Sequence, residues 1–221
     1  MTSLKIKVEN LHKSFDKKKV LDGVNLEVQD KESLVILGGS GSGKSVLIKS
    51  IISLLSIDSG KIFIDGNDIT KMNSDTLAIF RRRQIGIVYQ FYNLIPILTV
   101  EENITLPCDL DKNPVDKKQL DEILDTFGLR ARRKHLPNEL SGGQQQRTSI
   151  ARALIANPAL VLADEPTGNL DTKASEDIMN LLKISNRTYN QTIIMITHDL
   201  ELAKQADRII TISDGKIVEE G

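Results

Sequence analysis

The most informative part of the chain is a glycine-rich segment, residues 38–45, which reads Gly-Gly-Ser-Gly-Ser-Gly-Lys-Ser. It fits the pattern G-x-x-x-x-G-K-[ST] and lies between an apolar strand at 34–37 and a helical segment that starts at Val46. Glycines let a backbone curl so that successive N–H groups point inward at phosphate oxygens, and the positive end of the following helix adds to that field. We expect Lys44 to neutralise β- and γ-phosphate oxygens and the Ser45 hydroxyl to ligate Mg²⁺.

The alternative for this segment is an ordinary glycine-rich turn, but the lysine, the serine and both flanking elements are all present. The segment therefore predicts a nucleoside triphosphate site, although by itself it does not separate an ATPase from a GTPase or a small kinase. The residues expected to contact the nucleotide here are Gly38, Ser40, Gly41, Ser42, Gly43, Lys44, Ser45 and Val46.

A pair of carboxylates, Asp164 and Glu165, follows the apolar run 160–163. The pair therefore lies at the carboxyl edge of a sheet, where open α/β folds place ligands. Asp164 is suited to hold hydrated Mg²⁺, and Glu165, which points differently, could orient or deprotonate the attacking water. A solvated Asp-Glu pair is the alternative; the buried strand in front of it and the earlier phosphate loop favour the metal site.

Two more polar residues directly follow apolar runs. Gln90 comes after 85–89, and its amide oxygen could complete the Mg²⁺ shell; the alternative is a polar residue that simply ends a strand. His198 comes after 192–197 and could donate a hydrogen bond to the γ-phosphate, whereas a lone histidine is more often structural. We expect both to lie at the same sheet edge as the two carboxylates.

The segment 140–147, Leu-Ser-Gly-Gly-Gln-Gln-Gln-Arg, opens a helix expected to run to about Asn157. Ser141 and Gln144 have the spacing of a capping box. Two glycines, Gly142 and Gly143, lie in the first turn, where they disfavour a helix. They make sense if another group must approach this backbone closely, and a phosphate is the natural candidate because a helix N-terminus attracts anions.

The elements that must position these residues follow from apolar patterning. Alternating residues over the first thirty positions, punctuated by Asp22-Gly23, predict short antiparallel strands. A helix is predicted over 46–55, followed by a strand at 61–66 that ends in a tight turn. Strands that alternate with helices predict a mainly parallel sheet covered on both faces. Its expected strands are 34–37, 85–89, 160–163, 192–197 and 208–213.

The predicted fold is α/β: a P-loop NTPase core with a mixed, mainly parallel sheet, an N-terminal antiparallel β subdomain and an inserted α-helical subdomain. We expect one domain over 1–221, with the core formed by 1–90 and 150–221 and the helical part by 91–149. The insertion is inferred from two charged amphipathic stretches, several prolines and the lack of a convincing strand between 91 and 140.

Composition narrows the class of protein. The formal charge of −1 over 221 residues lacks the basic footprint of a nucleic-acid binder, so no nucleic-acid partner is expected. The triplet Arg81-Arg82-Arg83 is taken as a solvated face. The single cysteine, Cys108, excludes an intramolecular disulfide and is taken as a small apolar filler in a reducing compartment. No apolar run approaches the roughly 18 residues of a spanning helix, so a role at a membrane requires a partner.

These motifs together resemble the ATP-binding cassette (ABC) family over essentially the whole chain. The signature LSGGQ is present at 140–144, Asp171 matches the family's D-loop, and His198 its switch histidine. Phe15 falls where family members place an aromatic that stacks on adenine. The resemblance implies that the chain binds ATP and Mg²⁺ and hydrolyses ATP.

The resemblance also implies partners. In the family, two cassettes pair head to tail, and Ser141, Gly142 and Gly143 of one touch the γ-phosphate of ATP held by the other, with Gln144 beside them. The helical insertion docks on an integral-membrane transporter subunit, which places the chain on the cytoplasmic face of the inner membrane. A mechanical or regulatory coupling to a membrane partner without cargo transport is the alternative that the sequence leaves open.

Within the family, segments 91–103 and 162–171 look like the branch that contains macrolide-exporter, lipoprotein-releasing, cell-division and bacitracin-type ATPases. Segment 41–48 and the residues up to Gly66 look closer to phospholipid-trafficking ATPases, so cargo and direction of transport stay open. Repair-type ABC ATPases carry a very long coiled coil where this chain has only residues 91–140. Translation-factor members need two cassettes, and a small-molecule kinase has no use for LSGGQ.

Overall fold

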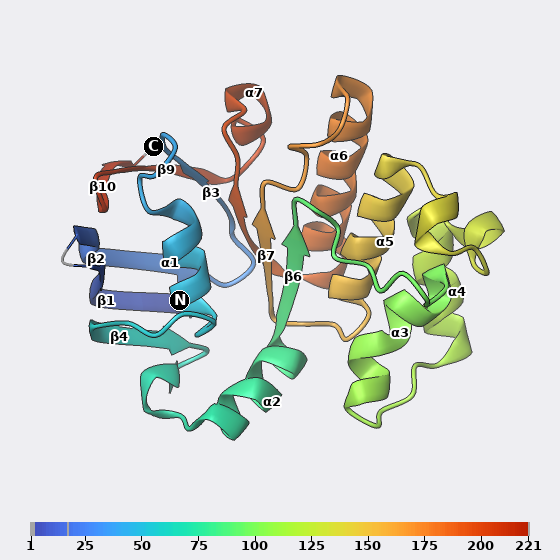
Figure 1. Ribbon diagram of the computed structural model, residues 1–221, viewed down its shortest axis with the longest axis horizontal. Coiled ribbons are helices and arrows are strands. Elements are labelled where there is room, and N and C mark those ends of the chain that lie inside the picture. The colour runs from blue at the N-terminus through green and yellow to red at the C-terminus, as the bar shows by residue number, and fades with distance from the viewer. Residues whose placement is uncertain (1–2, 17, 221) are drawn as a thin grey trace.

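The computed structural model describes residues 3–16 and 18–220, and it contains two sheets (Figure 1). The larger sheet has six strands in the order β10-β9-β3-β8-β7-β6, all parallel except β10, which runs antiparallel to β9. Its strands are β3 (Ser33–Leu37), β6 (Ile85–Tyr89), β7 (Leu160–Asp164), β8 (Thr192–Ile196), β9 (Arg208–Ser213) and β10 (Lys216–Glu220). The predicted mainly parallel sheet is confirmed.

The smaller sheet is antiparallel, in the order β2-β1-β4-β5. Its strands are β1 (Leu4–Phe15), β2 (Lys18–Gln29), β4 (Ser59–Ile64) and β5 (Asn67–Asp68). The first two strands are longer than predicted, because Asp22-Gly23 lies inside β2 and does not end a strand. Register shifts between β1 and β2 absorb the left-handed conformation of Gly23, at φ +75°.

The helices occupy the connections between strands. They are α1 (Lys44–Ile51), α2 (Ser74–Gln84), α3 (Val100–Leu110), α4 (Lys117–Thr126), α5 (Gly142–Leu154), α6 (Thr172–Tyr189) and α7 (Leu200–Ala203), with 3₁₀ turns η1 (Ile69–Lys71), η2 (Arg130–Arg132) and η3 (Pro137–Glu139). Helix α1 is shorter than the predicted 46–55. Ser53 takes a left-handed conformation, and the N–H groups of Leu54 and Leu55 both bond the Lys49 carbonyl, which turns the chain out of the helix.

Two apolar cores lie on opposite faces of the large sheet. Along β7, Leu160 and Leu162 pack with the antiparallel sheet and α1, whereas Val161 and Ala163 pack with the helices between β6 and α6. Successive side chains of a strand point to opposite faces, so a strand covered on both sides must be apolar throughout. This is why β7 reads as an unbroken apolar run.

Between β6 and β7 the described residues form helices α3, α4 and α5 and no strand. Helix α3 begins with a capping box in which Thr99 and Glu102 satisfy each other's backbone N–H groups. Figure 1 shows these helices on the side of β6 and β7 away from α1. Over the ranges that the structure describes, no helix combines the length and the apolar character needed to cross a bilayer.

Candidate functional site

The phosphate loop connects the end of β3 to the first turn of α1, as the motif requires. Gly38 and Gly43 both have positive φ, and a side chain at either would strike backbone. A Cβ on Gly38 would lie 2.4 Å from the Ile212 carbonyl oxygen, and one on Gly43 would lie 2.8 Å from that of Val20. The loop is therefore pressed against β9 and β2, and only glycine fits at these two positions.

Lys44 and Ser45 lie at the start of α1, at the mouth of this loop. The buried Lys44 ammonium donates to the carbonyl oxygens of Gly38 and Gly39, at 2.7 and 2.8 Å. The Ser45 hydroxyl donates to the Asp164 carboxylate at 3.4 Å, across 119 residues of sequence. The structure thus brings together the two motifs that the sequence placed far apart.

Asp164 ends β7, half-buried among charged groups. Burial raises the pKa of its carboxyl and Glu165 adds to this, while Lys49, Ser45 and Lys44 act in the opposite direction. A buried carboxylate beside cations and a hydroxyl is a suitable ligand for a hard cation.

Glu165 has a left-handed backbone, at φ +47°, unusual for a residue with a side chain. Its N–H donates to the Ile196 carbonyl at 3.0 Å, which ties the turn after β7 to the end of β8. Its carboxylate lies 3.3 Å from Nδ1 of His198, a mostly exposed side chain. The predicted water-activating group and the predicted phosphate sensor are therefore in direct contact.

Two of the candidate Mg²⁺ ligands, the Ser45 hydroxyl and the Asp164 carboxylate, are in contact, and the Gln90 amide is the third candidate. The Gln90 side chain lies against Gly168, where an added Cβ would come within 2.8 Å of Gln90 Nε2. Among the described residues, no cluster of three or more His, Cys, Asp or Glu side chains could hold a metal. Oxygen donors such as the Ser45 hydroxyl and the Asp164 carboxylate suit Mg²⁺, which proteins commonly hold through one or two carboxylates together with water and substrate phosphates.

The signature turn begins α5. Ser141 and Gln144 form the predicted capping box, with Gln144 Oε1 accepting from the Ser141 N–H at 3.0 Å. A Cβ on Gly142 would lie 2.9 Å from the Tyr92 hydroxyl, so glycine leaves room for that ring. Over the residues that the structure describes, no hydrogen bond or ion pair joins 141–144 to the phosphate loop, and Figure 1 shows α1 and α5 on opposite sides of β6 and β7.

Two other predicted nucleotide contacts lie outside this cluster. Phe15 ends β1 with 44% of its surface exposed, and the Lys13 ammonium lies 5.2 Å from its ring centroid. Asp171 caps α6, its carboxylate accepting from the Ala174 N–H at 2.8 Å. An exposed aromatic can stack on a base, whereas the cap gives Asp171 a structural task in its own chain.

Sequence reasoning missed the side chains that hold the Gln90 loop. Arg152 of α5 donates to the carbonyls of Tyr92 and Asn93, at 2.9 and 2.6 Å, and both acceptor residues have left-handed backbone. Burial lowers the pKa of this guanidinium. Asn169 donates to the Gln90 carbonyl at 3.0 Å. Arginine on a helix is common, and nothing in its spacing reveals distant carbonyl partners.

An apolar groove of about 460 Å³ opens beside this loop. It is lined by side chains of α2, β6, α3 and α5, among them the exposed Leu110, and by Leu54, which follows α1. Arg152 and Asn93 also line it. An apolar surface beside α3 is therefore left uncovered. It contacts the loop that contains Gln90, a candidate metal ligand.

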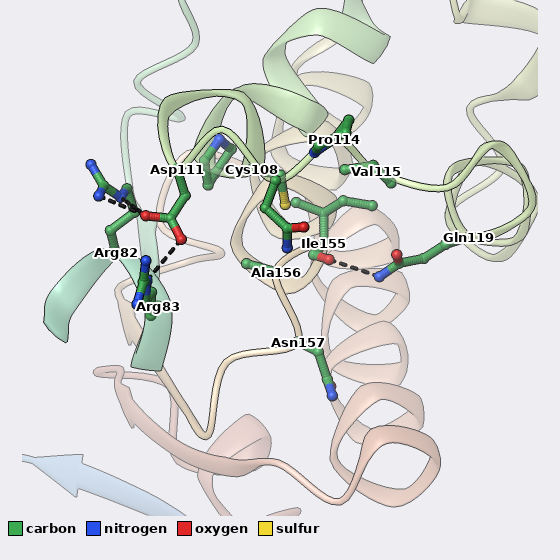
Figure 2. A pocket seen from close by; sticks show the side chains of 12 residues that line it. Arg82, Arg83, Cys108, Asp111, Pro114, Val115, Gln119, Ile155, Ala156 and Asn157 are labelled. Carbon is green, nitrogen blue, oxygen red and sulfur yellow. Dashed lines mark hydrogen bonds and ion pairs between the residues drawn. The ribbon is translucent and has the colours of Figure 1, made fainter. Parts of the chain in front are cut away.

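A second hollow of about 460 Å³ adjoins the groove, and Figure 2 shows Arg82 and Arg83 pointing at Asp111 on its rim. The two arginines bond the two carboxylate oxygens at 2.9 and 2.8 Å, and Arg81 donates to the Ser53 carbonyl. Helix α2 has no buried residue and the Arg83 side chain is 58% exposed, as expected of a solvated face. The arginines nevertheless also join α2 to the end of α3 and to the chain just after α1. Cys108 is buried, as predicted.

This fold and these motifs define an ATP-binding cassette. The family model described as ABC transporter matches residues 21–168, and the chain belongs to this family. It is an ATPase with a P-loop NTPase core.

The chain is 42% identical to the lipoprotein-releasing system ATP-binding protein LolD of Bacteroides fragilis, over 96% of this chain and 100% of that protein. It is 40% identical to the bacitracin export ATP-binding protein BceA of Halalkalibacterium halodurans, over 96% and 86%. It is 42% identical to the macrolide export ATP-binding/permease protein MacB of Brucella melitensis, of which it spans only 34%. The predicted branch of the family is confirmed.

Among solved structures, the fold is similar to a dimeric post-hydrolysis state of the ATP-binding cassette MJ0796 bound to ADP and Pi. The TM-score is 0.88 at 38% identity, with 98% of this chain and 97% of that chain covered.

Proposed function

We propose that the chain is the ATP-hydrolysing subunit of a membrane transporter and that it works as a head-to-tail pair of cassettes. The observation that carries this is the separation of the two half-sites. The phosphate loop, Asp164 and Glu165 gather at one place, while the signature turn 141–143 lies across β6 and β7 from α1. In a dimer with two-fold symmetry, each chain supplies its signature turn to the ATP site of the other. The dimeric MJ0796 cassettes support this arrangement.

In this proposal the chain's own residues divide the work. Lys44 and the loop N–H groups bind the β- and γ-phosphates, and Phe15 stacks on the adenine. Ser45, Asp164 and Gln90 would hold Mg²⁺, which supplies positive charge to the transferred phosphoryl group. Glu165 orients and deprotonates the attacking water, and His198, in contact with it, donates to the γ-phosphate. Residues 141–143 of the second copy close over the phosphate.

Glu165→Gln is the direct test. The amide keeps the size of the carboxylate but cannot take a proton from water, so turnover should fall by about 10²–10⁴-fold while ATP still binds. The variant should form a stable dimer when ATP is added, measured by size-exclusion chromatography with light scattering. Lys44→Ala, which should bind ATP poorly and stay monomeric, is the control. Native turnover in the Glu165→Gln variant would show that this residue is not the base.

The membrane partner, we propose, docks in the apolar groove at the cytoplasmic face of the membrane. The groove exposes Leu110, which is 62% accessible, and continues to Arg152, which holds the Gln90 loop. A short amphipathic helix of the membrane subunit fits such a surface. Docking there would connect transport to a loop that carries a metal ligand.

Leu110→Asp tests the docking site by placing a charge in the apolar contact. Co-purification with the membrane subunit should be lost, while ATP hydrolysis by the isolated chain is kept, because Leu110 touches no nucleotide-site residue in this proposal. Ile184→Asp, an equally polar change at an exposed position of α6, is the matched control. If both variants co-purify as the native chain does, the partner docks elsewhere.

A further inference from the structure

Gln146 is a polar side chain with no exposed surface, one turn beyond the signature turn on α5. Its amide nitrogen donates to two carbonyl oxygens, Pro166 at 2.6 Å and Tyr89 at 3.3 Å. Both partners are acceptors only, so the NH₂ end of the amide must face them. The orientation of this side chain is therefore fixed by its surroundings.

The two acceptor residues are each adjacent in sequence to a candidate residue of the nucleotide site. Tyr89 ends β6 and directly precedes Gln90, and Pro166 directly follows Glu165. Gln146 thus holds the ends of two neighbouring strands at a set separation, with a candidate metal ligand on one and the candidate base on the other. In the part of the chain that the structure describes, no other side chain joins both strand ends to α5 by hydrogen bonds.

The amide of Gln146 is only half satisfied. Gln146 Oε1 is buried and has no hydrogen-bond partner in the structure. An unpaired buried carbonyl oxygen disfavours folding. An apolar side chain of the same length would avoid it but would remove the donor from the Tyr89 and Pro166 carbonyls. The amide is better explained by the two strand ends that its nitrogen joins.

We propose that Gln146 is a positioning residue that couples the two ATP sites of the dimer. This rests on the head-to-tail pairing proposed above, in which the signature turn of one chain serves the partner's ATP while Gln90 and Glu165 serve its own. Ser141 caps α5, and Gly142, Gly143 and Gln146 lie in its first turns, so these residues move together. When ATP in the partner's site draws the signature turn inward, Gln146 carries the displacement to the Tyr89 and Pro166 carbonyls, and so to Gln90 and Glu165.

Gln146→Met tests the coupling, because methionine keeps the length of glutamine and removes both hydrogen bonds. ATP affinity, measured by equilibrium binding, should stay within about twofold, since the phosphate loop is untouched. The kcat should fall by up to about 10²-fold, the loss that a 1 Å misplacement of a catalytic group can cause. The Hill coefficient for ATP in turnover should fall toward one. Gln191→Met is the matched control: Gln191 is also buried, its amide has no hydrogen-bond partner, and it precedes β8 at the opposite end of the sheet.

A native kcat and Hill coefficient in Gln146→Met would overturn the coupling role. An equal loss in Gln191→Met would do the same, because the effect would then belong to any change in the core. If Gln146→Met does not fold, Gln146→Glu replaces it: the neutral acid still donates one hydrogen bond and the carboxylate none. As the pH rises and the introduced acid ionises, the kcat of Gln146→Glu, divided by the kcat of Gln191→Met at the same pH, should fall. A ratio that does not change with pH would refute the proposal.

The same preparations separate this inference from the proposed function. If Glu165→Gln forms no ATP-dependent dimer, the head-to-tail pairing itself is wrong. If that dimer forms and Gln146→Met turns over ATP as the native chain does, the pairing stands and only the coupling role of Gln146 fails.

Discussion

Replacing Gly86 by alanine should destabilise the protein, because the added methyl group would clash with the backbone of α5. Gly86 lies in β6, and a Cβ there would be 2.4 Å from the Ala153 carbonyl oxygen and 3.1 Å from Cγ of Pro158. Normal contact needs about 3.5 Å, so β6 and α5 would have to separate by roughly 1 Å. Such overpacking costs about 1–3 kcal/mol of unfolding free energy. For a domain of this size the midpoint of thermal unfolding should fall by about 2–12 °C.

Differential scanning calorimetry of the two proteins measures this directly, with urea unfolding as a second estimate of the free energy. Gly39→Ala is the control for stability, because a Cβ at Gly39 meets no atom within 4 Å and the backbone there is not left-handed. It adds the same methyl group without the collision. An unfolding midpoint for Gly86→Ala equal to or above the native value would refute the reasoning, since it would mean that β6 and α5 are not in close contact at this point.

Other contacts give equally definite expectations. Arg152→Met should lower both kcat and the unfolding free energy, the latter by about 1–3 kcal/mol, because the Tyr92 and Asn93 carbonyls lose a charged donor. Unchanged turnover would contradict a role of Arg152 in holding the loop. Hydrogen bonding by Arg83 holds the pKa of Asp111 below its usual value, so the pair stabilises the fold above pH ~3.9 and is lost as pH falls further. The stability gap between native protein and Asp111→Asn, followed by urea unfolding, should be full at pH 6 and narrow below pH 4; a constant gap would contradict this.

The parallel strands were predictable because their signal is local. A strand buried on both faces must be apolar throughout, so 85–89 and 208–213 coincide with β6 and β9 residue for residue. The capping box at Ser141 was predictable for the same reason, since both partners lie within one helical turn. The ends of other elements were not. A single left-handed residue, Ser53, ends α1 early, and residue type alone does not reveal that conformation.

The meaning of charged surface residues also depended on the fold. A run of three arginines has the composition of a solvated face, and only the packing of α2 against α3 shows that two of them share the carboxylate of Asp111. Asp171, expected at a nucleotide, is at the same time the cap of α6. Each of these partners is set by the position of another element, which a linear pattern does not contain.

The sequence by itself determined the chemistry of this protein. The phosphate loop, the carboxylate pair and the signature turn each work through a few consecutive residues, so their types and spacing predict what they bind. Only the tertiary structure decided which of them share a site. It places Ser45 beside Asp164 and Glu165 beside His198, it leaves the signature turn on the far side of two strands, and it joins Gln146 to both strand ends. The physical reason is that these contacts link segments far apart in the chain, and their geometry follows from how sheets and helices pack.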